Sequence, residues 1–216
     1  VEGTDVKKRP FSVAILGAGA AGLCTAIKLR EAGIEDFTIF EKAASVGGTW
    51  RDNTYPGSGC DVPSMLYSYS FEPKPDWSRK FAPQPEIVEY FETVARKYRL
   101  LPNIRFNTEI VEARFDEEEG LWRIRSAAGE EFTANVLISG VGQLNRPANP
   151  KIEGLSDFKG IAFHSARWNH DVDLAGKRVG VIGNGASAIQ FVPEIAPAAG
   201  KLTIFQRTPN WGVPKP

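Results

Sequence analysis

Residues 11–41 read FSVAILGAGAAGLCTAIKLREAGIEDFTIFE, and this stretch decides the fold. Its first six residues form an apolar run that is typical of a buried parallel strand. The turn Gly17-Ala-Gly19-Ala-Ala-Gly22 follows at once, then a helical pattern and a second apolar strand over residues 37–40. That strand ends at Glu41, 19 residues after Gly22. Strand, glycine turn, helix, strand and acid in this order predict a dinucleotide-binding unit, and a purely structural turn is the less favoured alternative.

Each part of this unit has a physical role in holding a nucleotide. Gly17 permits the tight turn, Gly19 lets the backbone approach a pyrophosphate, and Gly22 lets the helix pack close to the strand. The start of the helix, which includes Ala21, offers free N–H groups and a partial positive charge to phosphate. We expect Glu41 to accept hydrogen bonds from ribose hydroxyls, so this unit predicts an FAD site.

The same pattern occurs a second time. Residues 177–182 form a strand, Gly183-Asn-Gly185-Ala-Ser-Ala188 is the turn in its GxGxxA form, and residues 201–205 form the next strand. Nineteen residues separate Gly22 from Glu41 in the first unit, and the same interval after Ala188 reaches Arg207. Aligning the strand at residues 37–40 with the strand at residues 201–205 instead places Gln206 opposite Glu41. An arginine pairs with a 2′-phosphate that a carboxylate would repel, so the second unit predicts NADPH. The alternative is that Arg207 is an ordinary surface residue.

The remaining segments predict the organisation of the chain. Residues 51–85 are rich in Pro, Gly, Ser and aromatic residues, which predicts a long irregular segment of the kind that often carries function. From Pro85 onward, apolar residues at helical spacing predict a helix whose aromatic stripe lies in the core. Residues 104–140 predict strands, with a solvated hairpin turn at residues 116–120. The prolines within residues 145–150 predict a domain boundary.

These patterns predict an α/β fold with two Rossmann-like dinucleotide-binding units, built on doubly wound parallel sheets, the second of them truncated. The predicted domains are residues 1–150, which bind FAD, and residues 151–216, which form the incomplete start of an NADPH-binding domain.

Composition excludes several other classes of protein. The 216 residues carry 26 Lys plus Arg and 26 Asp plus Glu, so the net charge gives no reason to expect nucleic acid or an anionic membrane as a partner. No apolar run is long enough to span a membrane. Cys24 and Cys60 are the two cysteines, which is too few for a disulfide scaffold and predicts a cytoplasmic protein. No pattern of metal ligands is present.

Phe158-Lys-Gly160-Ile-Ala-Phe-His164-Ser-Ala-Arg-Trp168 lies just before the second nucleotide unit. It resembles the FxGxxxHxxxW fingerprint of the Baeyer–Villiger monooxygenases, flavoproteins that insert oxygen beside a ketone. The resemblance implies that His164 and Trp168 belong to a hinge in domain movement and take no part in bond making. Asn169 follows where the family usually has Pro or Asp, which leaves open a related flavin monooxygenase that oxidises nitrogen or sulfur.

A second segment, from Gly47-Gly48-Thr49-Trp50 to Cys60-Asp61, resembles the part of that family that runs from the FAD pyrophosphate to the flavin ring. The resemblance implies that FAD is contacted by Gly48, Thr49, Trp50, Asp61 and Tyr67. It implies that the nicotinamide lies near Gly59, Cys60 and Asp61. It implies that NADPH phosphates are held by Gly183, Gly185, Ala186, Ser187, Ala188, Arg207 and Thr208. Asp61 is expected to support catalysis by orienting an arginine that this chain does not contain.

The activity implied by the resemblance is the insertion of one oxygen atom of O2 beside a ketone carbonyl. NADPH reduces FAD, a C4a-peroxyflavin forms, and an ester or lactone results. Family members are much longer, so the chain resembles their N-terminal part and lacks the return segment that completes the FAD domain. The expected partners are therefore a ketone, O2 and the rest of the same enzyme.

Other functions remain as alternatives. The chain is expected to be a non-catalytic nucleotide-binding fragment if the missing part is essential, or a simple NADPH oxidase if the substrate pocket is absent. A flavin disulfide reductase is disfavoured because no CxxC pair is present.

Overall fold

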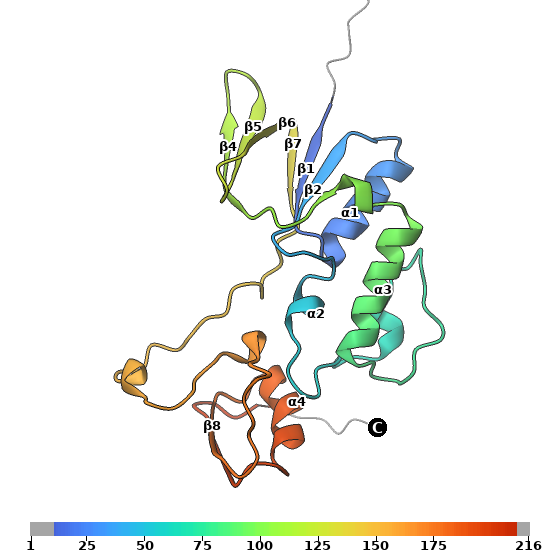
Figure 1. Ribbon diagram of the computed structural model, residues 1–216. Helices are drawn as coiled ribbons and strands as arrows, with labels where there is room; N and C mark the ends of the chain where they lie inside the picture. Colours follow the sequence, from blue (N-terminus) through green and yellow to red (C-terminus); the bar gives the residue numbers. More distant parts are fainter. Residues whose placement is uncertain (1–10, 211–216) are drawn as a thin grey trace, which may run out of the picture. The chain divides into compact units, whose positions relative to one another are not determined.

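The computed structural model describes residues 11–210, and its contacts divide the chain into two compact units (Figure 1). Unit 1 is Val1–Thr49 with Val88–Asn145. Unit 2 is Trp50–Ile87 with Arg146–Pro216. Each unit is therefore built from two separate stretches of sequence.

Unit 1 contains a four-stranded parallel sheet in the order β3-β2-β1-β7. Its strands are β1 (Val13–Leu16), β2 (Phe37–Phe40), β3 (Ile104–Arg105) and β7 (Val136–Ser139). In the pairing register, Ile15 of β1 lies between Ile39 of β2 and Ile138 of β7. Apolar side chains that alternate toward both faces explain why these strands read as continuous apolar runs.

Two helices accompany this sheet. Helix α1 (Ala20–Glu31) connects β1 to β2 and buries Leu23, Ala26 and Ile27 (Figure 1). Helix α3 (Gln84–Lys97) belongs to unit 1 from Val88 onward. Its Tyr90, Phe91 and Val94 are buried, which confirms the predicted aromatic core stripe.

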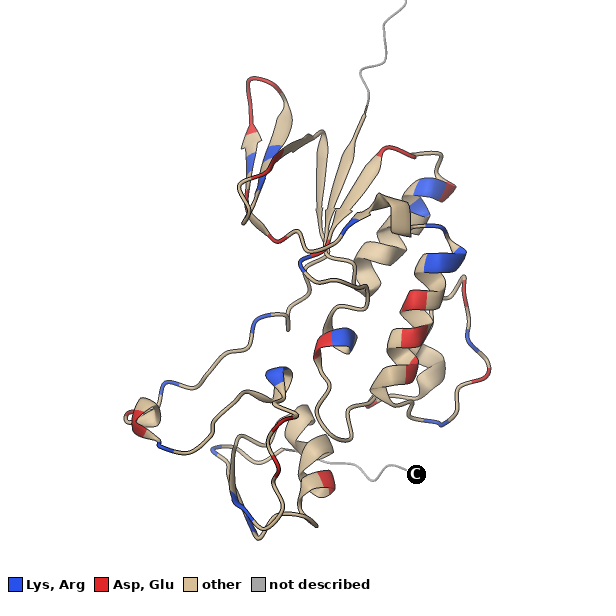
Figure 2. Cartoon of the chain, viewed as in Figure 1, with Lys and Arg blue, Asp and Glu red and all other residues tan. Residues whose placement is uncertain are grey.

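A separate antiparallel sheet in unit 1 consists of β4 (Ile110–Asp116), β5 (Leu121–Ser126) and β6 (Glu131–Ala134). The predicted hairpin joins β4 to β5, and its acidic turn is the red tip in Figure 2. Asp116 closes that turn by accepting hydrogen bonds from the backbone N–H of Glu118 and from Arg123 Nε at 2.7 Å.

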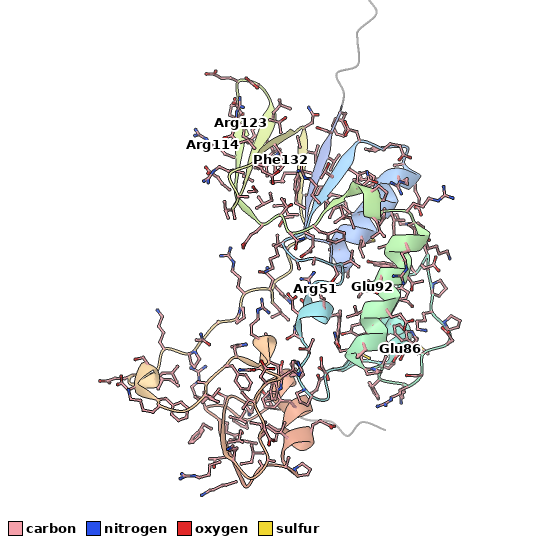
Figure 3. All side chains as sticks on the ribbon, viewed as in Figure 1. Arg51, Glu86, Glu92, Arg114, Arg123 and Phe132 are labelled. Atoms are coloured by element: carbon pink, nitrogen blue, oxygen red, sulfur yellow. The ribbon has the colours of Figure 1, made fainter. Side chains whose placement is uncertain are left out.

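The two sheets of unit 1 share a core cluster. Phe132 of β6, labelled in Figure 3, packs against Phe40 of β2 with ring centroids 4.8 Å apart. The guanidinium carbon of Arg105 lies over the Phe132 ring, 4.6 Å from its centroid. Ile124 of β5 and Ala14 of β1 are buried in the same cluster.

Unit 2 contains the parallel pair β8 (Arg178–Ile182) and β9 (Lys201–Phe205), connected by helix α4 (Ala186–Ile195). Val181, Ala188, Phe191 and Ile195 form its core. Residues 50–87 contain the end of the short helix α2 (Thr49–Asp52), the 3-10 helix η1 (Ser64–Tyr67) and the start of α3. The rest of that stretch is irregular, as predicted.

The prediction placed residues 50–87 in the FAD-binding domain, and in the structure they group with residues 146–216 in unit 2. Tyr55 shows the reason, because its ring is buried in the core of unit 2 beside Phe191. The assignment of one nucleotide to each domain stays a prediction.

In the stretch from residue 11 to residue 210, no helix combines the length and apolarity needed to cross a membrane. Within the same stretch, no group of three or more His, Cys, Asp or Glu side chains is arranged to hold a metal ion.

Candidate functional site

The glycine turn of unit 1 leaves no room for side chains on its inner side. Gly17 has a φ of +97°, and a Cβ added there would lie 2.8 Å from the carbonyl oxygen of Gly140. A Cβ on Gly22 would lie 1.8 Å from the carbonyl oxygen of Gly17. The start of α1 therefore packs directly on the turn, which is the role that the sequence assigned to Gly22. Gly140, which follows β7, was missed by sequence reasoning.

The start of α1 at the same turn carries only small residues, Gly19, Ala20 and Ala21. Gly19 is the N-cap of α1 and makes no side-chain capping hydrogen bond, and the first turn of α1 has no acidic residue. Gly48 has a φ of +54°, and a Cβ there would lie 3.1 Å from the Cα of Gly19. Ala21 is exposed in the first helical turn, and Thr49 follows Gly48 at the start of α2. The N–H groups of a first helical turn suit a phosphate, and no residue of that turn in α1 carries a carboxylate.

Glu41 connects the end of β2 to the glycine turn. Its carboxylate is buried and accepts hydrogen bonds from the N–H of Ala18 at 2.8 Å and the N–H of Ala43 at 2.9 Å. The sequence predicted a ribose-binding role alone. The structure adds that Glu41 holds the turn in place.

The glycine turn of unit 2 is open. Gly183 has a φ of +102°, and nothing lies within 4 Å of a Cβ added to Gly183 or Gly185. Gly185 is the N-cap of α4, again with no side-chain cap and no acid in the first turn. Exposed Ala186 and half-buried Ser187 follow it, while the Ala188 side chain packs into the core.

The end of β9 is fastened to this turn by Asn184. Its side-chain amide donates to Gln206 Oε1 and to the carbonyl oxygen of Thr208, each at 3.0 Å. Arg207 lies between these two partners with an exposed side chain. The structure therefore brings Arg207 and Thr208 to the glycine turn of the same unit.

The loop at residues 59–61 is also part of unit 2. Gln190 of α4 hydrogen-bonds to Gly59 and to Asp61, whose carboxylate is exposed. Cys60 is fully buried, with its Sγ 3.7 Å from Ser64 Oγ. Gln190 was missed by sequence reasoning, although a polar residue between the apolar Ile189 and Phe191 of α4 is a signal that could have drawn attention to it.

Two aromatic side chains lie beside this loop. The rings of Trp50 and Tyr67 meet edge to face, with centroids 5.1 Å apart. Burial raises the pKa of the Tyr67 phenol above its usual value near 10, and the neighbouring Cys60 and Asp61 raise it further. Tyr67 therefore keeps its proton at physiological pH.

The fingerprint segment is used for packing. His164 Nδ1 accepts a hydrogen bond from the N–H of Ala166 at 3.1 Å and so caps the 3-10 turn that ends at Trp168. Trp168 packs against Phe191 of α4, with centroids 5.2 Å apart. Earlier in the segment, the ring of Phe158 lies over Gly160. These contacts fit a structural role for His164 and Trp168.

Comparison with known sequences places the chain in a family. Residues 14–216 match the sequence profile of the pyridine nucleotide-disulphide oxidoreductases. The chain belongs to this family. Cys24 and Cys60 are not joined in a disulfide, and the sequence has no CxxC pair.

Relatives of this chain confirm the resemblance found in the sequence. A protein of Pseudomonas aeruginosa named Baeyer-Villiger monooxygenase is 54% identical over 213 residues, which are 99% of this chain and 40% of the relative. The structure of oxidized steroid monooxygenase bound to NADP matches with a TM-score of 0.85 and 45% identity, over 94% of this chain and 40% of that one. The structure of the OTEMO complex with FAD and NADP matches with a TM-score of 0.87 and 39% identity, over 93% and 39%. The chain thus spans about 40% of the length of these relatives.

Proposed function

We propose that the chain is the FAD- and NADPH-binding part of a monooxygenase that inserts one oxygen atom of O2 beside a ketone carbonyl, giving an ester or lactone. One observation carries this proposal: the chain contains two uncapped glycine turns, followed by different residues at the end of the next strand. The first strand ends in Glu41 and the second in Gln206-Arg207. The names of the relatives support the same reaction class.

The first turn fits FAD because its cradle consists of backbone that side chains would fill. We assign the pyrophosphate to the N–H groups at the start of α1 and the ribose to Glu41. The full set that would hold FAD is Gly17, Gly19, Ala21, Gly22, Glu41, Gly48, Thr49, Trp50, Asp61 and Tyr67.

The second turn fits NADPH because it has open space above Gly183 and Gly185 and a cation beside it. Arg207 would form charge-assisted hydrogen bonds with the 2′-phosphate, next to Thr208. Gly183, Gly185, Ala186, Ser187 and Ala188 would hold the remaining phosphates, and Gly59, Cys60 and Asp61 would face the nicotinamide. When bound, the two nucleotides would supply the electrons and the activation of oxygen.

The protein's own residues bind and orient these groups. Asp61 presents an exposed carboxylate near the nicotinamide side and would orient a cationic group of the rest of the enzyme. Neutral Tyr67 adds an apolar and hydrogen-bonding edge without a charge. Phe158, Gly160, His164 and Trp168 form the fingerprint that would act as a hinge. We place this activity in the cytoplasm.

The test begins with the visible spectrum of the purified chain after addition of FAD, followed by anaerobic titration with NADPH. A protein-bound flavin spectrum that bleaches on titration is the expected result. Absence of flavin uptake would contradict the FAD site. Bound flavin that NADPH fails to bleach would contradict the NADPH site.

A second candidate is a nucleotide-binding fragment without catalysis, which the coverage of about 40% of each relative favours.

A turnover assay with cyclohexanone separates the candidates, and this ketone is chosen because a cyclohexanone monooxygenase is among the structural neighbours at 37% identity. Lactone formed per NADPH consumed supports a monooxygenase, whereas peroxide alone indicates an NADPH oxidase. Oxidation of an amine or sulfide in place of the ketone would indicate the nitrogen- or sulfur-oxidising alternative.

A further inference from the structure

The side chain of Gln190 uses every hydrogen-bonding position of its amide on one loop. Its Oε1 accepts from the Tyr55 hydroxyl at 3.0 Å and from the N–H of Gly59 at 3.3 Å. Its Nε2 donates to the carbonyl oxygen of Gly59 at 2.9 Å and to Asp61 Oδ1 at 2.6 Å. A primary amide has two donor hydrogens and two acceptor lone pairs, so all four are used.

The same loop, residues 55–61, also packs on α4. A Cβ on Gly57 would lie 2.9 Å from the carbonyl oxygen of Gln190 and 2.7 Å from Glu194 Cγ. The ring of Tyr55 is buried against Phe191, with centroids 6.0 Å apart. The loop is therefore packed tightly against α4, through the backbone at Gly57 and through the ring of Tyr55.

Gln190 lies one helical turn from the start of α4, four residues after Ala186. Ala186 and Gln190 belong to one continuous helix, so a ligand that stabilises the first turn also stabilises the backbone that carries Gln190. The amide is neutral, and it holds Asp61 without placing a second charge next to the carboxylate.

We propose that Gln190 is a positioning residue that couples nucleotide binding at the first turn of α4 to the loop carrying Gly59 and Asp61. In this role, Gln190 fixes the orientation of the Asp61 carboxylate when NADP(H) occupies the glycine turn. The inference rests on the proposed NADPH site. The inference adds Gln190 of α4 to the proposed site, as a residue that acts through Asp61.

Hydrogen exchange of the full chain, measured by mass spectrometry with and without saturating NADP+, tests this coupling. In the wild type, NADP+ is expected to slow exchange in residues 183–189 and also in residues 55–61. The variant Gln190→Met keeps the size of the side chain and removes its hydrogen bonds. We expect exchange at the loop to rise by roughly tenfold or more without ligand, because all four hydrogen bonds of the Gln190 amide are lost. NADP+ should still slow exchange at residues 183–189 and no longer at the loop.

Two further variants define the mechanism. Tyr55→Phe removes one of the four hydrogen bonds and keeps those to Gly59 and Asp61, so the response of the loop to NADP+ should persist. Gln190→Glu keeps the acceptor oxygens, loses both donations and faces the Asp61 carboxylate, so the response should be lost; it also serves if Gln190→Met fails to fold. Gln143→Met, at an exposed glutamine of unit 1, is the matched control.

The outcomes separate this inference from the function on which it rests. Slower exchange at residues 183–189 with an unchanged loop in the wild type overturns the coupling and leaves the NADPH site standing. A loop response that survives in both Gln190 variants also overturns the coupling. No effect of NADP+ anywhere in the wild type overturns the NADPH site, and the coupling with it.

Discussion

At the scale of the single residue, Glu41 stabilises the glycine turn and is also proposed to bind the ribose. Its carboxylate is the partner of two backbone N–H groups, at Ala18 and Ala43. In Glu41→Gln, the new NH2 group faces one of these donors and leaves it unsatisfied. We expect the free energy of unfolding to fall by roughly 1–3 kcal/mol without any ligand. Urea unfolding measures the change, and Glu109→Gln, at an exposed glutamate, is the matched control. Equal stabilities would show that Glu41 serves the ligand alone.

Arg207 is predicted to act on the ligand alone, because its side chain is exposed. Arg207→Ala should weaken binding of NADP+ by tenfold or more, since a hydrogen bond to a charged group contributes roughly 1.5–3 kcal/mol. Binding of NAD+ and the unfolding midpoint should stay nearly unchanged. Isothermal titration with both nucleotides measures the preference, and Arg178→Ala, at an exposed position of β8, is the control. An equal loss for NAD+ and NADP+ would refute a 2′-phosphate contact.

At the scale of the element, the packing of α1 on its glycine turn depends on the absence of one methyl group. In Gly22→Ala the new Cβ meets the Gly17 carbonyl oxygen at 1.8 Å. The helix must shift, so we expect the free energy of unfolding to fall by roughly 3 kcal/mol. We also expect FAD binding to be lost. Gly33→Ala is the matched control, because its φ of +78° costs about 1 kcal/mol while nothing lies within 4 Å. Thermal unfolding of both variants measures their stabilities. Similar losses of stability in the two variants would mean that the helix shifts at little cost to relieve the contact with the Gly17 carbonyl.

The first turn of α3 contains a pH-dependent contact. Glu86, labelled in Figure 3, accepts hydrogen bonds from the N–H of Ser78 at 3.0 Å and from its hydroxyl at 2.6 Å. Lys74 lies 3.6 Å from the carboxylate and also pairs with Asp76. Burial raises the pKa of Glu86, but the hydrogen bonds from Ser78 and the charge of Lys74 outweigh burial, so the pKa is lowered from its usual 4.5.

A lowered pKa in the folded state means that the ionised carboxylate stabilises the fold above pH 4.5. This stabilisation disappears as the pH falls through the lowered value. Ser78→Ala should therefore melt below the wild type at pH 7, and the difference should shrink in acid. Melting temperatures between pH 3 and pH 7 measure this, and a gap that stays constant with pH would refute the role of the Glu86 charge.

The elements that could be predicted from sequence are those encoded locally. Strands β1, β2, β8 and β9 were recognised because short apolar runs flank glycine turns whose spacing is fixed by a single βαβ unit. The two-residue strand β3 was not delimited, because its existence depends on pairing with β2 far away in the sequence. Gln190 was missed for the same reason, since Gly59 lies 131 residues from it. Apolar periodicity carries no information on such polar contacts.

At the scale of the whole molecule, unit 2 exposes a set of large apolar side chains on its strands. Ile182, Ile204 and Phe205 are 54%, 45% and 59% exposed. Ile182 and Phe205 are paired across β8 and β9, so these two exposed side chains lie side by side, while Ile204 points to the other face. Exposed apolar side chains favour association, so we expect the isolated chain to self-associate as its concentration rises. Light scattering over a concentration series measures this, and Phe205→Ser should shift the onset to higher concentration. A monodisperse monomer throughout would contradict the prediction.

The interleaved order of the two units has a consequence for synthesis on the ribosome. Unit 1 is complete once Asn145 has emerged, while Tyr55 and its loop must wait for Phe191 and the rest of α4. At translation speeds of roughly 5–20 residues per second, the stretch from Asn145 to the end of α4 takes about 2–10 seconds. During this time residues 50–87, which are rich in aromatic side chains, lack their packing partners in α4. They lie in sequence between the two stretches that form unit 1. Such a segment is a natural client for a chaperone, and slowing elongation after Asn145 should prolong its capture.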